Sequence, residues 1–497
     1  MWKIIKLVIV VVAVATISHG GYNTITSPTS CYFLLNCAPD KPFHPVTCSN
    51  VCKTPEGAKA VPLTRMFVEN HGWSVESCSP NPRVYRETVF YKSWLEFNDQ
   101  GTAWSLDQKL AILNQIAEFR KEQHPLYIVI FVHGWHHNAD DSESSCDPDR
   151  AKRDAVKFNY FMARQADQLR RLMEQRGSRE MAKVLGIFVG WRGDSITTPG
   201  LSYLTIGNRA AAADRLASDR SAKSLFAMLK EVNLAMLDAD PNGQMLVVGH
   251  SLGGRVLSRM LIDDIVGGVP QPLGKNTQIV ALEAAVGADC FDRALGPKAS
   301  PRPRADKPTF ISISSEHDTA IRRIYPPGST FLIDDCSTES KARGVTIGSH
   351  DNYLTHTLTF NHVGKVSLVK QTHPTRPGAP DSSPAFPPAG SNKNWFQLVA
   401  DRPLAYTMYD LEDCRRKNIS RCYNGDDVDF YTMAFKVEDN IFKAGQIWNI
   451  RTDRNTINFL LGGDNLDATH NGYVSTNLAR LMVELQYPHL LKRPGAR

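Results

Sequence analysis

A serine flanked by glycines is the strongest chemical signal in the sequence. The segment Gly249-His250-Ser251-Leu252-Gly253-Gly254 contains a Gly-x-Ser-x-Gly pattern between a short apolar run and an amphipathic stretch. A strand that turns sharply into a helix leaves such a serine on a strained backbone with its hydroxyl exposed. The N-terminus of the helix supplies free N–H groups beside that hydroxyl. The pattern predicts that Ser251 is a nucleophile; the alternative is a glycine-rich turn with a bystander serine.

A second segment offers the backbone donors that a serine nucleophile needs. His133-Gly134-Trp135 directly follows the apolar run 126–132. Acyl transfer requires two N–H groups directed at the oxygen that becomes negatively charged. We expect one from Leu252, the residue after the nucleophile, and the other from Trp135. Gly134 would let the backbone approach the substrate closely.

The acid of a catalytic triad should lie at the carboxyl edge of the predicted sheet, where sites on parallel sheets form. Asp318 lies just past the predicted strand 309–314, and its role would be to orient an imidazole ring. Glu316 is the near rival, and Glu283 and Asp289 are more distant alternatives.

The base should follow the last strand and precede the last helix. His470 lies between a predicted strand at 446–451 and a predicted amphipathic helix at 474–485. The alternatives are His350, His356 and His362, which follow Asp318 more closely in the sequence. Sheet order rather than sequence distance sets triad geometry, so the placement favours His470.

Several further residues are expected to line the substrate site, namely His133, Gly134, His250, Trp191 and Arg192. The segment Gly190-Trp191-Arg192-Gly193 ends a predicted strand at 183–189. It is interpreted either as a wall of the acyl pocket, with Arg192 on a polar substrate group, or as a structural turn with Arg192 in an ion pair. Both interpretations stay open.

A metal site is a weaker interpretation of the same region. Its candidate ligands are His133, His136, His137, Asp140 and Asp141. The spacing H-x-x-H-H-x-x-D-D is not an established ligand pattern, and the predicted oxyanion loop already accounts for His133. We expect no metal and no cofactor.

The elements that would position these residues alternate along the chain. Apolar, strand-like runs occupy 88–97, 126–132, 183–189, 245–248, 278–282 and 309–314, and helical patterns occupy 106–120, 153–174, 210–239 and 252–261. Alternation of this kind predicts an α/β fold with a mostly parallel sheet flanked by helices.

These motifs resemble the α/β-hydrolase superfamily. The phrases Phe131-Val132-His133-Gly134-Trp135, Gly190-Trp191-Arg192-Gly193 and Ser314-Ser315-Glu316-His317-Asp318 are similar to those of a little-characterised bacterial branch of esterase- and lipase-like proteins. The resemblance covers roughly 88–335 and 445–485. It implies the α/β-hydrolase fold and a Ser–acid–His triad.

Two regions depart from the minimal superfamily pattern. Residues 21–83 form a Cys-rich N-terminal extension, and 371–440 form a linker and lid-like insertion that begins with a Pro-, Ser- and Gly-rich stretch. The hydrolase core is expected at 84–370 and again at 441–497. We expect the insertion to cover part of the site; the alternative is a peripheral decoration.

The N-terminus and the cysteines indicate export. Residues 1–20 combine Lys3 and Lys6 with an uncharged apolar run at 7–17, as a signal peptide does; an uncleaved anchor is the alternative. The ten cysteines predict disulfides rather than a zinc site, and Cys414 and Cys422 are expected to close a short loop. We expect an exported protein, either secreted, periplasmic or attached to the cell envelope.

Composition narrows the function further. The 497-residue chain has a formal net charge of +6 and no basic stripe interleaved with aromatic residues, which argues against a nucleic-acid partner. The sequence therefore predicts a serine hydrolase acting on a small-molecule or lipid-like carboxylic ester. Amidase or thioesterase chemistry would use the same atoms, and a non-catalytic binding or surface protein on a hydrolase fold is the alternative. Membrane-surface association and oligomeric state stay open.

Overall fold

The computed structural model describes most of the predicted hydrolase core. The described residues are 52–53, 61–62, 87–88, 90–135, 137–139, 154–175, 181–193, 206–299, 308–318, 320–326, 336, 342, 344–367, 403–404, 427–437, 445–452, 470, 473 and 476–487. The predicted signal peptide lies outside these residues. So do nearly all of the Cys-rich extension and most of the predicted insertion.

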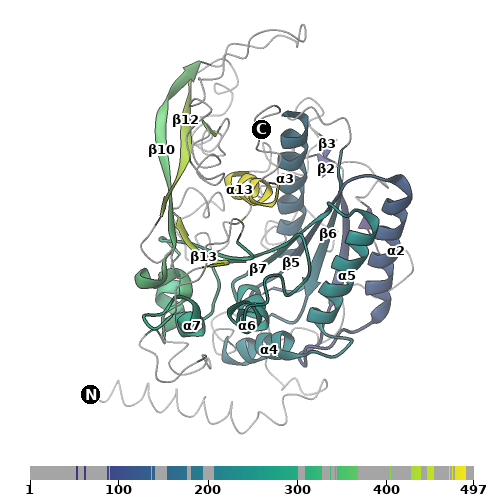
Figure 1. Ribbon diagram of the computed structural model, residues 1–497, viewed down its shortest axis with the longest axis horizontal. Coiled ribbons are helices and arrows are strands. Elements are labelled where there is room, and N and C mark those ends of the chain that lie inside the picture. Colours follow the sequence, from purple (N-terminus) through teal and green to yellow (C-terminus); the bar gives the residue numbers. More distant parts are fainter. Residues whose placement is uncertain are drawn as a thin grey trace, which may run out of the picture.

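A large, mostly parallel sheet forms the centre of the molecule (Figure 1). Its parallel part has the order β4 (Tyr91–Glu96), β6 (Lys183–Gly190), β5 (Leu126–Val132), β7 (Gln244–His250), β8 (Thr277–Leu282), β9 (Phe310–Ser315), β13 (Ile447–Thr452) and β10 (His356–Ser367). Antiparallel strands extend both edges, with β1 (Cys52–Lys53) beside β4, and β12 (Asp427–Val437) then β11 (Pro403–Leu404) beyond β10. A separate pair joins β2 (Val61–Pro62) to β3 (Glu87–Thr88).

The central strands are apolar because helices cover both of their faces. Every residue of β5, β7 and β8 is buried, as expected for a parallel sheet between helical layers. In Figure 1, α3 (Asp154–Gln175) and α13 (Thr476–Gln486) lie together on one face. The other face carries α2 (Leu106–Glu122), α5 (Leu225–Ala239), α6 (Leu252–Val266) and α4 (Ile206–Ser218).

The predicted fold class is confirmed, and most of the predicted strands and helices lie where expected. The stretch 210–239, predicted as mostly helical, is divided into α4 and α5. Ser224 causes the restart, because its side chain accepts a hydrogen bond from Ala227 N at 3.2 Å and so caps α5.

The described part of the predicted insertion extends the sheet. In Figure 1, β10 and β12 form a long antiparallel ribbon at one side of the molecule, and β11 pairs with β12. Sequence analysis did not predict these strands. The domain boundaries and the lid assignment for 371–440 stay predictions.

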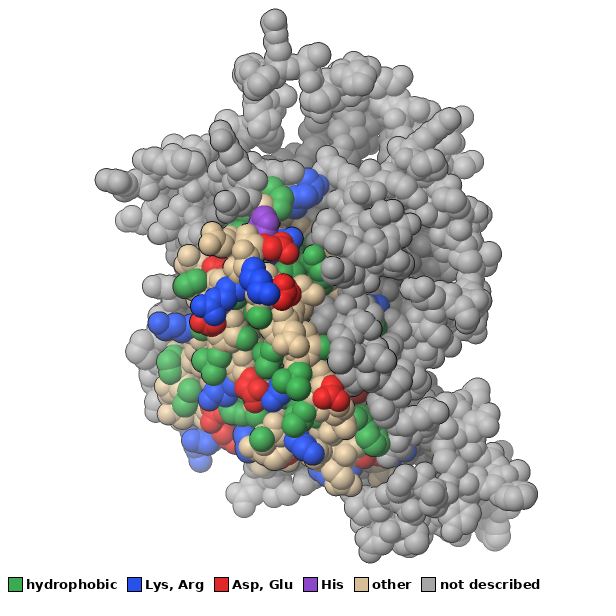
Figure 2. Space-filling view, turned by 90° about the vertical axis from the view of Figure 1, so that its right-hand side faces the viewer, with side chains coloured by type: hydrophobic (Ala, Val, Ile, Leu, Met, Phe, Trp, Pro, Cys, Tyr) green, Lys and Arg blue, Asp and Glu red, His purple; other side chains and the backbone are tan. Residues whose placement is uncertain are grey.

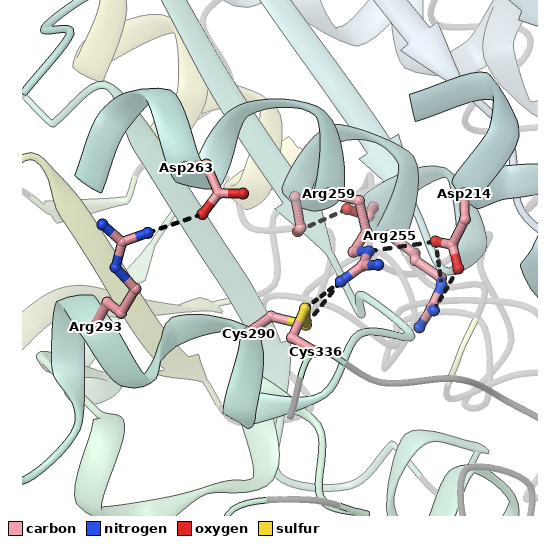
Figure 3. Close-up of a disulfide and its surroundings, with 9 residues drawn as sticks. Asp214, Arg255, Arg259, Asp263, Cys290, Arg293 and Cys336 are labelled. Carbon is pink, nitrogen blue, oxygen red and sulfur yellow. Dashed lines mark hydrogen bonds and ion pairs between the residues drawn. A yellow bond between two sulfur atoms is a disulfide. The ribbon is translucent and has the colours of Figure 1, made fainter. Parts of the chain in front are cut away.

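A disulfide lies beside α6, next to the Arg259 side chain of that helix. It joins Cys290, in the 3-10 helix Ala288–Phe291, to Cys336 (Figure 3). Arg259 donates to both sulfur atoms, and its Nε lies 3.6 Å from Asp214 Oδ1. Asp214 also accepts two hydrogen bonds from Arg255, at 2.8 and 2.7 Å, which ties α4 to α6.

The disulfide is compatible with an exported protein. The pairing of Cys290 with Cys336 could not be read from the sequence, and the expected Cys414–Cys422 loop lies outside the described residues. Within the described ranges, no helix is long and apolar enough to cross a membrane. On the described part of the face in Figure 2, basic and acidic side chains are interspersed with hydrophobic ones.

Candidate active site

Ser251 stands on a strained turn between β7 and α6. Its backbone has φ 55° and ψ −118°, a conformation that residues other than glycine rarely adopt and that costs of the order of 1–3 kcal/mol. A side chain at Gly249 would bring its Cβ within 2.4 Å of Gly253 O, so only glycine lets the chain turn back this closely. The predicted strand–turn–helix geometry around Ser251 is therefore present.

Three backbone hydrogen bonds hold the strained residue in place. Ser251 N donates to Leu282 O at 2.9 Å, and Ser251 O accepts from Ala285 N and Arg255 N, each at 3.1 Å. These bonds connect the turn to the carboxyl end of β8 and to the first turn of α6. The surrounding structure thus fixes a conformation that the serine alone would avoid.

The loop after β5 runs directly against Ser251. A Cβ on Gly134 would lie 2.7 Å from Ser251 Cβ and 3.0 Å from His250 O. Trp135 follows it and is partly buried against the core. Leu252 is the first residue of α6, where helical N–H groups have no partner within the helix. The two backbone segments predicted to form an oxyanion hole therefore flank Ser251.

Asp318 and His470 form a buried acid–imidazole pair. His470 Nδ1 lies 2.6 Å from Asp318 Oδ2, although the residues are 152 positions apart in the sequence. The Asp318 side chain is fully buried, whereas His470 keeps 14% of its side chain exposed. Asp318 Oδ1 accepts from Ala320 N at 2.7 Å and from Ile321 N at 3.2 Å. A charged carboxylate with these donors holds the ring in one orientation.

The electrostatics favour an ionised Asp318. Burial alone would raise its pKa, but the charge of His470 and the hydrogen bond from that ring lower the pKa below the ordinary value. When the His470 ring is neutral, its hydrogen is on Nδ1, facing Asp318, which leaves Nε2 as the acceptor. This is the tautomer that a general base requires.

His250 connects the pair to the turn that carries Ser251. His250 Nε2 donates to His470 O at 2.8 Å, and the two rings lie 4.9 Å apart between centroids. The structure therefore brings Asp318, His470 and His250 into contact and places Ser251 next to His250 in the chain.

Asp154, at the start of α3, was missed by the sequence analysis. Its fully buried carboxylate accepts a hydrogen bond from Tyr473 OH at 2.7 Å. Lys157 Nζ lies 3.4 Å away, His137 Nε2 3.5 Å and His250 Nδ1 4.0 Å. Burial would raise the pKa of Asp154, but the interactions with His137, Lys157 and His250 and the hydrogen bond from Tyr473 hold it below the ordinary value. An acidic residue in the first turn of a helix is so common that its sequence carried no signal.

His133 and Trp191 support each other beneath the loop that follows β5. The fully buried His133 accepts from Trp191 N at 3.1 Å through Nε2, and the Trp191 indole donates to His133 O at 3.0 Å. Burial lowers the pKa of His133, so the ring is neutral. These contacts position the turn that carries Gly134. A direct contact of either side chain with substrate stays a prediction.

Arg192 forms the ion pair that the sequence left as one of two interpretations. It pairs with Asp99, which also binds Arg209 at 2.8 Å. The cations of Arg209 and Arg192 offset the effect of burial and lower the pKa of Asp99. A substrate contact of Arg192 stays a prediction.

The alternative acids and bases occupy other surroundings. Glu316 is about half exposed and lies 3.1 Å from His317. His356 is buried in β10 with its Nδ1 2.9 Å from Thr355 Oγ1, and the His350 ring packs at a tilt against Tyr353. Of the histidines that the structure describes, His470 is the one that contacts Asp318.

The suggested metal ligands are described only in part. His136, Asp140 and Asp141 lie outside the described residues, whereas His137 contacts Asp154. Among the side chains that the structure describes, no group of three His, Cys, Asp or Glu is arranged to hold a metal ion.

Comparisons with known proteins add little to this geometry. No known protein family and no curated protein matches the chain. Among solved structures, phospholipase PlaB from Legionella pneumophila matches over 48% of this chain and 48% of its own length, with 12% identity and a TM-score of 0.19. A match at that score carries no argument about chemistry, so function has to be argued from the site.

Proposed function

We propose that this protein is a serine hydrolase that cleaves carboxylic esters through a Ser251–His470–Asp318 triad. The observations that carry the proposal are the strained Ser251, in the turn before α6, and a His470–Asp318 pair at 2.6 Å that the neighbouring His250 contacts. A positive-φ serine at the end of a central strand is costly, and strain of this kind clusters at functional sites. The substrate would be a small-molecule or lipid-like ester.

The proposed reaction proceeds through an acyl-enzyme. Ser251 Oγ attacks the carbonyl carbon while His470 Nε2 takes the hydroxyl proton, and Asp318 stabilises the imidazolium that forms. The carbonyl oxygen becomes negative and accepts hydrogen bonds from Leu252 N and Trp135 N. His470 then protonates the leaving alcohol. Water attacks the acyl group with His470 as base, which releases the acid and restores Ser251.

Covalent labelling with a fluorophosphonate tests this proposal directly. We expect one label at Ser251, located by mass spectrometry, together with hydrolysis of short-chain p-nitrophenyl esters. Ser251→Ala should abolish both. Ser258→Ala is the matched control, because Ser258 lies on α6 but donates its hydroxyl to Gly254 O at 2.7 Å. No label on folded protein, or undiminished label in Ser251→Ala, would refute the nucleophile and favour a binding protein on a hydrolase fold.

The identity of the base has its own test. Triad members act as a unit, so His470→Ala should lose orders of magnitude in kcat, much as Ser251→Ala does. His356→Ala, in the buried β10, should retain most of its kcat if the variant folds. Near-normal kcat in folded His470→Ala would show that another residue is the base.

A further inference from the structure

A second buried carboxyl group lies beside the Asp318–His470 pair. Glu283 is the first residue after β8, has φ 45° and is fully buried. Its Oε1 accepts from Ser315 N at 2.8 Å, so the side chain reaches across to the end of β9. The Asp318 carboxyl group lies within hydrogen-bonding reach of the Glu283 carboxyl group. Two carboxyl groups from adjacent strands thus share one site from which water is excluded.

This contact requires a proton between the two groups. Ionised carboxylates only accept hydrogen bonds, and two of them in contact repel each other. No N–H or O–H group of the described residues donates to Glu283 Oε2. Asp318, in contrast, accepts from Ala320 N, Ile321 N and the His470 ring. The negative charge is therefore more strongly stabilised on Asp318, and Glu283 is the protonated member of the pair.

The charged groups around Glu283 agree with this assignment. Burial, followed by the charge and the hydrogen bond of Asp318, raises the pKa of Glu283 well above its ordinary value. Arg322, in the π-helix Ala320–Ile324, acts in the opposite direction, but its side chain is exposed and its charge is screened by water. His470 lies beyond Asp318 and favours charge on that carboxylate instead.

We propose that Glu283 is a positioning residue that stays protonated at neutral pH and donates its hydrogen to Asp318. The inference rests on the proposed function, because it concerns the acid of the same triad. Glu283 and the backbone donors together fix the Asp318 carboxylate, which keeps one oxygen directed at His470 Nδ1. The donated hydrogen bond also spreads the negative charge of Asp318 and so moderates the basicity of His470.

Infrared spectroscopy tests the proton without relying on activity. A protonated carboxylic acid has a carbonyl stretch separate from that of carboxylates. In the Ser251→Ala background, we expect such a band between about pH 6 and pH 8, where ordinary carboxyl groups are ionised. Glu283→Gln should remove it. Glu96→Gln is the matched control, because Glu96 is another buried glutamate, bonded to Gln108 Nε2 at 2.9 Å and outside the site; it should leave the band in place.

Kinetics distinguish positioning from simple packing. Glu283→Gln keeps an acceptor for Ser315 N and a donor for Asp318, whereas Glu283→Met loses both. We expect Glu283→Met to lower kcat/KM on the order of 10- to 100-fold, and Glu283→Gln to restore most of that loss. Without the donated hydrogen bond, Asp318 raises the pKa of His470, so the acid limb of the pH profile moves to higher pH in Glu283→Met and stays in place in Glu283→Gln.

Opposite results would overturn the inference. If Glu283 were ionised, Glu283→Gln would remove a negative charge near His470 and move the acid limb to lower pH. Absence of the infrared band in the Ser251→Ala protein, or its persistence in Glu283→Gln, would also refute the shared proton. Absence of the band in the Ser251→Ala protein would refute the shared proton even if no Glu283 variant folds. A band without fluorophosphonate labelling of the unmodified protein would refute the proposed function and leave the shared proton intact.

Discussion

Replacing His250 with glutamine should make the stability of this protein less sensitive to acid. His250 is fully buried and donates through Nε2 to His470 O. Its Nδ1 has no hydrogen-bond partner among the described residues and lies 4.0 Å from Asp154 Oδ2. A second proton on this ring would place a cation in a closed site beside His470. Glutamine retains an N–H donor for His470 O but does not titrate.

The magnitude follows from the difference between the folded and unfolded states. Burial, and then the charge of His470, lowers the pKa of His250 from 6.5 to about 3. A group whose pKa is lower in the folded protein stabilises it above the unfolded value, and this stabilisation is lost as the pH falls. Between about pH 7.5 and pH 5, this one histidine should therefore cost about 2 kcal/mol of the free energy of unfolding.

Urea denaturation at the two pH values measures this loss. The unmodified protein should lose about 2 kcal/mol more than His250→Gln does, whatever the absolute stability of the variant. His124→Gln, which replaces a partly exposed histidine next to β5, is the matched control and should behave like the unmodified protein. An equal loss in His250→Gln and the unmodified protein would show that His250 is not a buried neutral group.

Two further substitutions test the packing of the turn and the disulfide. Gly253→Ala would place a Cβ 2.0 Å from Val132 O, so we expect the free energy of unfolding to fall by about 3 kcal/mol. In the control Gly186→Ala, the nearest atoms to the new Cβ belong to the flexible Met162 side chain, so the free energy of unfolding should fall less. Equal urea midpoints for the two variants would contradict this difference. Cys290→Ser opens a loop of 46 residues and should lower the free energy of unfolding on the order of 4 kcal/mol. Cys336→Ser should lower it by the same amount, and the variant with both substitutions should lose no more than either single variant, whereas an additive loss would contradict the pairing.

The parts of the fold that could be predicted are those determined by local sequence. The run 126–132 was predicted as a strand with the bounds of β5, because a β-branched and aromatic run has no polar face to expose. The turn at Ser251 was predictable because its glycines are required within a few residues of one another. The strands β10 and β12 were missed, since each is stabilised by a partner far away in the sequence.

In the candidate site, too, only the residues placed by local sequence patterns could be predicted. Asp318 and His470 could be proposed from their places after β9 and β13, because the carboxyl ends of parallel strands meet at one edge of the sheet. Glu283 was considered only as an alternative acid, although it directly follows β8. Its contact with Asp318 depends on how the ends of β8 and β9 are aligned, which no local pattern encodes.

Three unfavourable features gather around this edge of the sheet: the positive-φ Ser251, the neutral buried His250 and the carboxyl pair of Glu283 and Asp318. Each costs stability, and none is needed to close the core. Each of these residues lies at or just after the end of a parallel strand, and the neighbouring strands fix the register of that strand. If one residue relaxed, several backbone hydrogen bonds would be disturbed at once. A rigid sheet is therefore what allows these groups to persist. Their location beside the turn that carries Ser251 is the pattern expected where strain is retained for chemistry rather than for folding.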